Sequence, residues 1–452
     1  MAGTATWSSR LGFILATVGA AVGLGNFWRF PYLAGENGGG AFVLVYLICI
    51  FAVAIPLAMT ELLIGRRARK SAVSSTKEVA VEVGASSKWS AIGWMGMIAT
   101  FLIGTFYCVI GGWVIFYIIQ SVTGGFSSNP DEVSAAFDGL LASPLQLIFY
   151  QIIFVIISVM VPVWGVNKGI ERAVNVLMPT LLVMMLGLVV FAGLSGGFGE
   201  AVTFLFSVDF SKITAEVVLA AIGQAFFSVG IGMAILLTYG AYLDRGTKLP
   251  GSATLIAIAD TGVAVLAGLV IFPLVFANDL DPGQGPGLVF VTLPLAFGQM
   301  AGGAVIGLIF FTLLLFAALT SSIAIVEIVA SFMEERGINR KRSAVLSGIV
   351  LFVLGLGTVF SLNIWSGVYP LDFIWLFEGK TFFDSVDFIT ASFMLVGGGL
   401  LIALFGGWVL PAKLAAEEFG WAENSLKFRA WQVLMRFVIP LLLSVMIINI
   451  FL

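Results

Sequence analysis

Long apolar segments recur along this chain of 452 residues, too many for a water-soluble core. Hydrophobic residues make up 60% of the chain and charged residues only 10%. Because a helix needs about 20 mainly apolar residues to cross a bilayer, these segments predict an all-α polytopic membrane protein with eleven transmembrane helices. We place the spans near residues 11–36, 40–66, 89–122, 145–164, 168–195, 215–243, 253–278, 303–334, 343–362, 384–410 and 429–452.

Lysine and arginine lie mostly on one side of the predicted spans. If the N-terminus is inside, 19 of the 22 basic residues fall in cytoplasmic segments, and only Arg29, Lys212 and Lys380 fall outside. Cytoplasmic loops carry the positive excess in membrane proteins. The pattern therefore predicts a cytoplasmic N-terminus and, after eleven spans, an extracellular C-terminus.

Several function classes lack the residues on which they depend. The chain has no histidine, which excludes histidine-based catalysis, proton relays and metal sites. Cys49 and Cys108 lie in apolar spans, where buried free thiols are favoured over a disulfide or a metal pair. Since we also find no nucleophile–base pairing, cofactor motif or basic patch, we expect neither an enzyme nor a nucleic-acid partner.

Two of the predicted spans are interrupted near their centres. Glycines break the first span and are followed closely by Asn26 and Arg29, and SVGIG at residues 228–232 breaks the sixth. A broken helix in hydrocarbon leaves backbone polar groups unpaired, which is tolerable only where they line a cavity or bind a ligand. Either glycine cluster alone would favour simple helix packing through small residues.

The two breaks occupy matching positions in two halves of the chain. Such pairing indicates an inverted-repeat transporter that holds substrate and ions near the membrane midplane. The chain would then be a single domain (residues 1–452). It would consist of a first five-helix repeat (11–195), a second inverted repeat (215–410) and an extra eleventh helix (429–452).

An acidic residue, Asp260, lies inside the apolar seventh span. A charge at the centre of a span costs about 2.5–3.5 kcal/mol on insertion scales, so such a residue marks a functional site by default. No lysine or arginine lies at that depth in the neighbouring spans. A water-filled path or an unidentified basic partner is the competing explanation.

Four motifs together resemble the neurotransmitter:sodium symporters. They are GLGNFWRFPY (23–32), ENGGGAF (36–42), GQAFFS (223–228) and ALTSSIAIVE (318–327). The resemblance covers nearly the whole chain and is closest to bacterial sodium-coupled transporters of hydrophobic and aromatic amino acids. It implies symport of such amino acids across the plasma membrane by alternating access. An amino-acid sensor or receptor on the same scaffold is the alternative, and a gated channel is a weaker one.

The resemblance implies two sodium sites made of oxygen ligands. The first would use Ala21, Asn26, Ser228 and Asp260, completed by the substrate carboxylate. The second would use carbonyls of Gly19, Val22 and Ala317 with the hydroxyls of Thr320 and Ser321. Without the resemblance, we would expect both hydroxyls to bond carbonyls of their own helix. A substrate carboxylate among the ligands would make ion and substrate binding mutually dependent.

We predict that chloride is not required. Chloride-dependent relatives carry asparagine at the position of Asp260 and serine at that of Ala264. The fixed carboxylate of Asp260 would supply the negative charge that chloride supplies elsewhere, although Tyr46 and Gln224 remain from the family's chloride environment.

The substrate is expected to be an α-amino acid, because monoamine transporters of the family have aspartate where this chain has Gly23. By resemblance, Gly25 and Tyr107 meet the substrate carboxylate, while carbonyls of Ala21 and Phe227 accept from the ammonium group. The side-chain pocket would be lined by Ile103, Phe227, Gly230, Met233, Ser321 and Ile325, and Ser228 would also belong to the substrate site. Its small and deformable members leave room for a large apolar or aromatic side chain.

Gate residues also match the family. They are Arg29 and Asp387 as an outer ion pair, Phe227 as an aromatic lid, and Trp7 and Glu335 on the inner side. Snorkelling toward the interface is the alternative for the outer pair. The family's N-terminal arginine is absent, and Thr4 stands at its approximate place.

Overall fold

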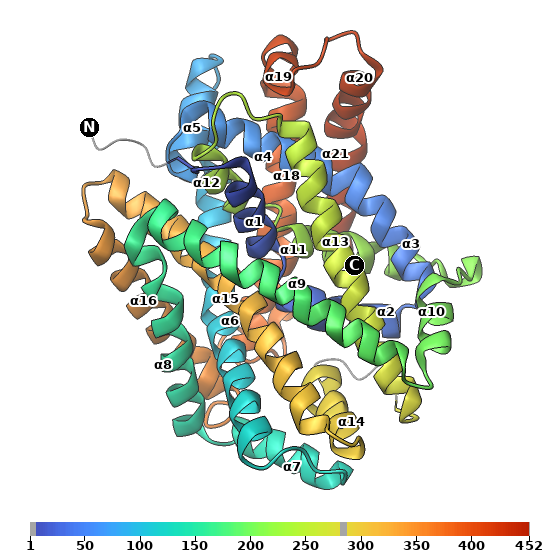
Figure 1. Ribbon diagram of the computed structural model, residues 1–452. Helices are drawn as coiled ribbons and strands as arrows, with labels where there is room; N and C mark the ends of the chain where they lie inside the picture. Colours follow the sequence, from blue (N-terminus) through green and yellow to red (C-terminus); the bar gives the residue numbers. More distant parts are fainter. Residues whose placement is uncertain (1–5, 281–286, 452) are drawn as a thin grey trace.

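The computed structural model describes residues 6–280 and 287–451, and within these ranges its regular structure is helical, with no β-strand. The apolar runs explain this architecture, because only a helix satisfies its backbone N–H and C=O groups within one membrane-spanning segment. Figure 1 shows the helices gathered into one bundle. The prediction of an all-helical, multi-pass membrane protein is confirmed by these helices.

The bundle consists of long helices, and several of them are divided. They are α1 (Arg10–Ala21) and α2 (Phe30–Glu36), α3 (Gly40–Cys49) and α4 (Ile55–Ala68), α6 (Ala91–Thr123), α8 (Pro144–Met160), α9 (Arg172–Gly193), α11 (Ala215–Val229) and α12 (Ile235–Ala241), α13 (Leu249–Ala277), α15 (Gly303–Glu335), α16 (Arg340–Ser361), α17 (Phe382–Phe388) and α18 (Val396–Leu404), and α20 (Leu426–Val433) and α21 (Ile439–Asn449).

Short helices and turns join or extend these elements. The short α-helices are α5 (Ala72–Glu82), α7 (Pro130–Leu141), α10 (Phe198–Phe206), α14 (Leu293–Gln299) and α19 (Ala412–Phe419). The π-helical turns are Gly25–Arg29, Ile50–Ala54, Val166–Glu171, Leu288–Thr292, Ile389–Leu395, Phe405–Val409 and Leu434–Val438. The 3-10 turns are Ser87–Ser90, Pro162–Trp164, Phe210–Lys212 and Trp375–Phe377.

Within the described ranges, nine helical segments are long and apolar enough to cross a membrane, and a bent pair makes a tenth. The pair consists of α1 and Gly25–Glu36, which meet at 53°. The sixth predicted span is not among these segments, because α11 has only 15 residues. At about 1.5 Å per residue it reaches about 22 Å, less than the hydrocarbon thickness of about 30 Å.

Burial separates an inner group of helices from an outer one. In the most apolar part of Ser87–Thr123, 78% of residues are buried, against 22% in Leu426–Asn449. Helix α6 packs along α15, α8 and α16, and α1 packs against α13, α15 and α9. Figure 1 shows α5, α12 and α19 toward one end of the bundle and α7 and α14 at the other. The interior between α1, α6, α11 to α13 and α15 therefore holds both breaks.

Candidate binding site between two helix breaks

The first break begins where α1 ends at Ala21. Val22 is extended, with φ −67° and ψ 106°, and the chain resumes helical geometry at Gly25. The Gly23 N–H donates to Asn26 Oδ1 at 2.9 Å, and the Leu24 N–H donates to the Tyr107 hydroxyl at 3.2 Å. Side chains therefore satisfy backbone groups that the interrupted helix releases.

The second break separates α11 from α12. Gly230, Gly232 and Ala234 have φ values of 74°, 76° and 57°, the left-handed region that favours glycine. The Gly232 N–H donates to Glu61 Oε1 at 2.8 Å, and the Thr100 hydroxyl donates to the Met233 carbonyl at 2.5 Å. Two other helices, α4 and α6, therefore hold this segment in place.

Glu61 was missed from the sequence. Its side chain is fully buried, and only its Oε1 has a hydrogen-bond partner among the described residues. The available signal was an acid inside the apolar run AIPLAMTELLIG, which is the argument that singled out Asp260.

A polar cluster around Asp260 joins the two breaks. Asn26 Nδ2 donates to Asp260 Oδ1 at 2.8 Å, and the Ser228 hydroxyl donates to Asp260 Oδ2 at 2.6 Å. Tyr46 extends the cluster by donating to Ser228 Oγ at 3.3 Å. All three residues of the core, Asn26, Ser228 and Asp260, are at most 1% exposed. The structure thus brings together three of the four predicted ligands of the first sodium site from three helical segments.

The donor set of this cluster fits a hard cation. Carboxylate, amide and hydroxyl oxygens are the ligands that hard cations prefer. In the described part of the chain no three His, Cys, Asp or Glu residues gather as they would for a transition metal. A buried carboxylate that faces only neutral donors also gains from a bound cation, since an unpaired buried charge is costly.

A cavity of about 40 Å³ lies beside the cluster, between the two breaks. Eight of the predicted substrate-binding residues line it, namely Ala21, Gly25, Ile103, Tyr107, Phe227, Met233, Ser321 and Ile325. Ser228 and Gly230 are not among the lining residues, whereas Leu24, Thr100 and Ile235, which were not predicted, are. A Cβ at Gly23 would lie 2.6 Å from Ser321 Oγ and 2.7 Å from the Tyr107 hydroxyl, so this wall has no room for a larger residue.

The residues proposed for the second cation lie together between α1 and α15. Ser321 Oγ donates at 3.3 Å to the carbonyls of both Val22 and Ala317. A Cβ at Gly19 would lie 3.2 Å from the Thr320 Cβ. Thr320 itself donates to carbonyls of its own helix, at 3.1 Å and 3.0 Å. Ser321 therefore bridges the two helices, while Thr320 follows the alternative of bonding within its helix.

Of the residues predicted for the outer gate, Arg29 lies over the ring of Phe227. Its guanidinium carbon is 5.0 Å from the centre of the Phe227 ring, within the range of a cation–π contact. In the described ranges Arg29 and Asp387 do not form an ion pair within 4.0 Å. The predicted outer pair is thus not closed in this structure.

On the inner side, the two predicted gate residues bond to other groups. The Trp7 indole N–H donates to the Tyr239 carbonyl at 3.1 Å, and the Trp7 ring packs edge-on against Tyr239 and Tyr242. Glu335 accepts from the Ser71 N–H at 3.2 Å. Thr4 lies outside the described residues. Trp7 therefore packs against α12 and the residue that follows it, and Glu335 bonds to the residue before α5.

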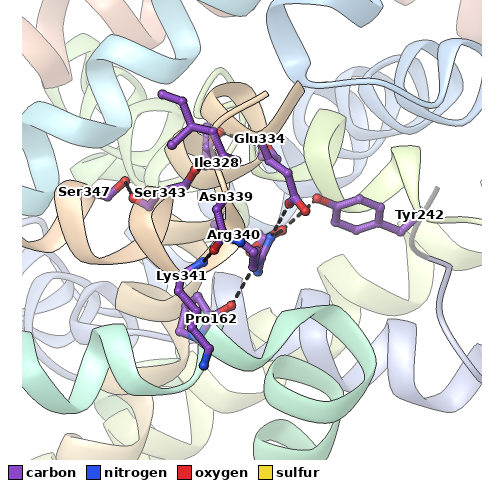
Figure 2. Close-up of polar contacts among 12 residues, drawn as sticks. Pro162, Tyr242, Ile328, Glu334, Asn339, Arg340, Lys341, Ser343 and Ser347 are labelled. Atoms are coloured by element: carbon purple, nitrogen blue, oxygen red, sulfur yellow. Dashed lines mark hydrogen bonds and ion pairs between the residues drawn. The ribbon is translucent and has the colours of Figure 1, made fainter. Parts of the chain in front are cut away.

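A buried ion pair that the sequence did not reveal joins α15 to the start of α16 and to the residue that follows α12. Arg340 forms an ion pair with Glu327, whose side chain is fully buried, and its Nε donates to the Pro162 carbonyl at 2.8 Å. The Tyr242 hydroxyl donates to Glu327 Oε1 at 2.7 Å. Figure 2 shows Arg340 between Pro162 and Tyr242, with a dashed line from Arg340 to Pro162.

Comparison with known proteins extends over nearly the whole chain. The model described as the sodium:neurotransmitter symporter family matches residues 4–130 and 138–450. The uncharacterized sodium-dependent transporter YhdH of Bacillus subtilis is 37% identical over 453 residues, covering 98% of this chain and 97% of the relative. An uncharacterized sodium-dependent transporter of Haemophilus influenzae is 36% identical, with the same coverage. The crystal structure of MhsT in complex with L-phenylalanine matches with a TM-score of 0.90 and 40% identity, over 99% of this chain and 100% of that chain.

Proposed function

The chain belongs to the sodium:neurotransmitter symporter family, and on that premise we propose that it carries hydrophobic and aromatic L-amino acids across the plasma membrane by sodium-coupled symport. The matched family and relatives are transporters and not enzymes, in agreement with the sequence prediction. Movement would proceed by alternating access between the two membrane faces. Sodium binding would favour outward-facing states, and substrate would permit occlusion.

The cluster of Asn26, Ser228 and Asp260 carries this proposal. It places a buried carboxylate next to the cavity between the two breaks, where released backbone groups are also available. A sodium ion at the cluster would neutralise Asp260 and attract the carboxylate of an amino acid in the cavity. Each ligand would then strengthen binding of the other, which is the physical basis of coupled transport.

The lining of the cavity supports an amino acid with an apolar side chain. The Tyr107 hydroxyl and the backbone near Gly25 offer polar partners, while Ile103, Met233 and Ile325 offer apolar surface. Gly23 places no acid at the position where monoamine transporters of the family carry aspartate. The phenylalanine complex of MhsT, a similar structure, supports the same substrate class.

We further propose that two sodium ions bind and that chloride does not. Ser321, which contacts carbonyls of both α1 and α15, would take part in the second site together with Thr320 after a rotation of its hydroxyl. Asp260 would supply the fixed negative charge that makes chloride unnecessary.

Eleven spans follow if α11 and α12 count as one crossing, since together with the break they cover residues 215–241. The chain would then be one domain built of two inverted five-helix repeats, with an eleventh helix, an inner N-terminus and an outer C-terminus. In this orientation the Arg340–Glu327 pair closes the inner side, and inward opening requires that it break.

Reconstitution in liposomes would test the proposed function. Uptake of labelled tryptophan and leucine would be measured under an inward sodium gradient, with potassium in place of sodium as the control and gluconate in place of chloride. We expect sodium-driven accumulation that survives removal of chloride. Sodium-dependent binding without accumulation would favour an amino-acid sensor instead, and loss of uptake in gluconate would overturn the proposed role of Asp260.

A further inference from the structure

Met233, which lines the cavity, belongs to a strained segment of backbone. Residues 230–234 contain three left-handed residues, and one of them, Ala234, is not glycine. Left-handed geometry is sterically unfavourable for alanine, because its Cβ approaches the backbone. The segment therefore keeps this shape only while neighbouring groups hold it.

Two side chains from other helices hold the segment. Glu61 of α4 accepts from the Gly232 N–H, and Thr100 of α6 donates to the Met233 carbonyl at 2.5 Å. Thr100 is 1% exposed and lines the cavity together with Met233. Its hydrogen bond therefore fixes the backbone of a residue whose side chain faces the substrate.

The direction of this hydrogen bond is unusual for a threonine in a helix. Helical threonines commonly donate to a carbonyl one turn earlier in the same helix. Thr105, five residues farther along α6 and equally buried, does so by donating to the Leu102 carbonyl at 2.6 Å. Thr100 instead donates across to the second break. Thr105, on the same helix, is therefore a matched control for Thr100.

The hydrogen bond from Thr100 matters because the cavity is small. About 40 Å³ accommodates only a few water molecules, at about 10–15 Å³ each, so a bulky side chain must displace part of the lining. Ile103 and Ile325 lie on the uninterrupted helices α6 and α15. Met233 lies on the nonhelical segment and is the more movable wall. How far it can withdraw depends on the bond from Thr100.

We propose that Thr100 is a specificity-determining residue, whose hydroxyl limits the retreat of Met233 and so sets how well bulky aromatic amino acids compete with smaller aliphatic ones. The role presupposes the amino-acid site of the proposed function. It adds the element that selects among substrates of that class.

Competition binding to the purified full-length protein would test this role. Labelled leucine would be displaced by unlabelled leucine or tryptophan in saturating sodium, and the ratio of the two apparent affinities would be compared among variants. In Thr100→Val, which keeps the shape but loses the hydroxyl, we expect the ratio to shift toward tryptophan by about twofold to tenfold, the range that one buried hydrogen bond contributes. Thr105→Val, the control on the same helix, should stay at the wild-type ratio.

Two further substitutions of Thr100 test the same role if the valine variant fails to fold. Thr100→Ser retains the hydroxyl and should return the ratio toward that of wild type, whereas Thr100→Ala should shift it as Thr100→Val does, even if the valine variant fails to fold. An unchanged ratio in the variants that lack the hydroxyl, or an equal shift in Thr105→Val, would overturn the role of Thr100. Because binding is measured without transport, a wild-type protein that binds but does not accumulate amino acids would refute the symport proposal alone. If wild type bound neither amino acid, both proposals would fall.

Discussion

In the first span, a side chain of the same turn bonds one of the backbone groups that the break releases. In the sixth span, side chains of distant helices bond the backbone of the break. Asn26 satisfies the Gly23 N–H within the same turn, and no residue of that turn needs a left-handed conformation. The segment after α11 has three left-handed residues and is held by Glu61 and Thr100. The first break is thus held partly by its own turn and partly by Tyr107 and Ser321, whereas the left-handed segment of the second break is held by Glu61 and Thr100.

This difference predicts that substitutions at the two breaks have different effects. Changes at the first break and at Asp260, to which Asn26 is bonded, should act on ligand affinity. Changes at the supports of the sixth break should act on stability and on the shape of the pocket. Four variants test this division, beginning with the largest expected effect.

Gly23→Asp should abolish amino-acid binding. The new Cβ would crowd Ser321 and Tyr107, and the carboxylate would repel the carboxylate of the substrate. We expect the affinity for labelled tryptophan to fall by at least about 100-fold, as for an unpaired buried charge. Gly223→Ala, at a helical glycine with open space around it, should bind normally. Normal tryptophan binding by Gly23→Asp would show that the substrate carboxylate lies elsewhere.

Asp260→Asn should weaken sodium binding by about 10-fold to 100-fold, because it removes the fixed charge that would face the ion. The asparagine keeps one oxygen, which can still accept from Asn26, while its NH2 group replaces the oxygen that accepts from Ser228, so the first break should retain its shape. Sodium titration of tryptophan binding, in chloride and in gluconate, would measure the effect. We expect partial recovery in chloride only. Unchanged sodium affinity would remove Asp260 from the site.

Glu61→Leu should destabilise the protein by about 1–3 kcal/mol, since it leaves the Gly232 N–H buried without an acceptor. Glu61→Gln keeps an acceptor and should unfold at nearly the wild-type temperature. Thermal unfolding in detergent would compare the two variants. Equal damage by both would mean that the charge of Glu61, and not its hydrogen bond, supports the sixth break.

Tyr107→Phe should have the smallest effect, a loss of substrate affinity of about twofold to tenfold. It removes the hydroxyl that accepts from the Leu24 N–H and would meet the substrate. Tyr117→Phe is the matched control on α6, because the Tyr117 hydroxyl donates to the Phe290 carbonyl away from the cavity. This control should lower stability without changing affinity. Equal affinities of the two variants would place Tyr107 outside the substrate site.

The sequence predicts features that depend on local pattern better than those that depend on distant partners. The first break was visible because Asn26 follows its glycines, and Asp260 was visible as a charge in an apolar span. Glu61 and Thr100 meet their partners 171 and 133 residues away, so no local pattern reveals their bonds. The Arg340–Glu327 pair was missed for a similar reason, since it forms across the turn between α15 and α16. The motif resemblance predicted most of the residues that line the cavity, but not Thr100, which holds the backbone at Met233.

The isolation of Asp260 has an electrical consequence. Among the described residues it has no ion-pair partner within 4.0 Å, so its charge is compensated only by what binds. In the proposed cycle the site around Asp260 would bear one net positive charge with two sodium ions and a zwitterionic amino acid bound, and one negative charge when empty. Each charge that crosses the membrane field is worth about 2.3 kcal/mol per 100 mV. An inside-negative voltage would therefore favour both the inward step and the empty return, and a neutral residue at this position would remove the contribution of this site to the voltage dependence of the return.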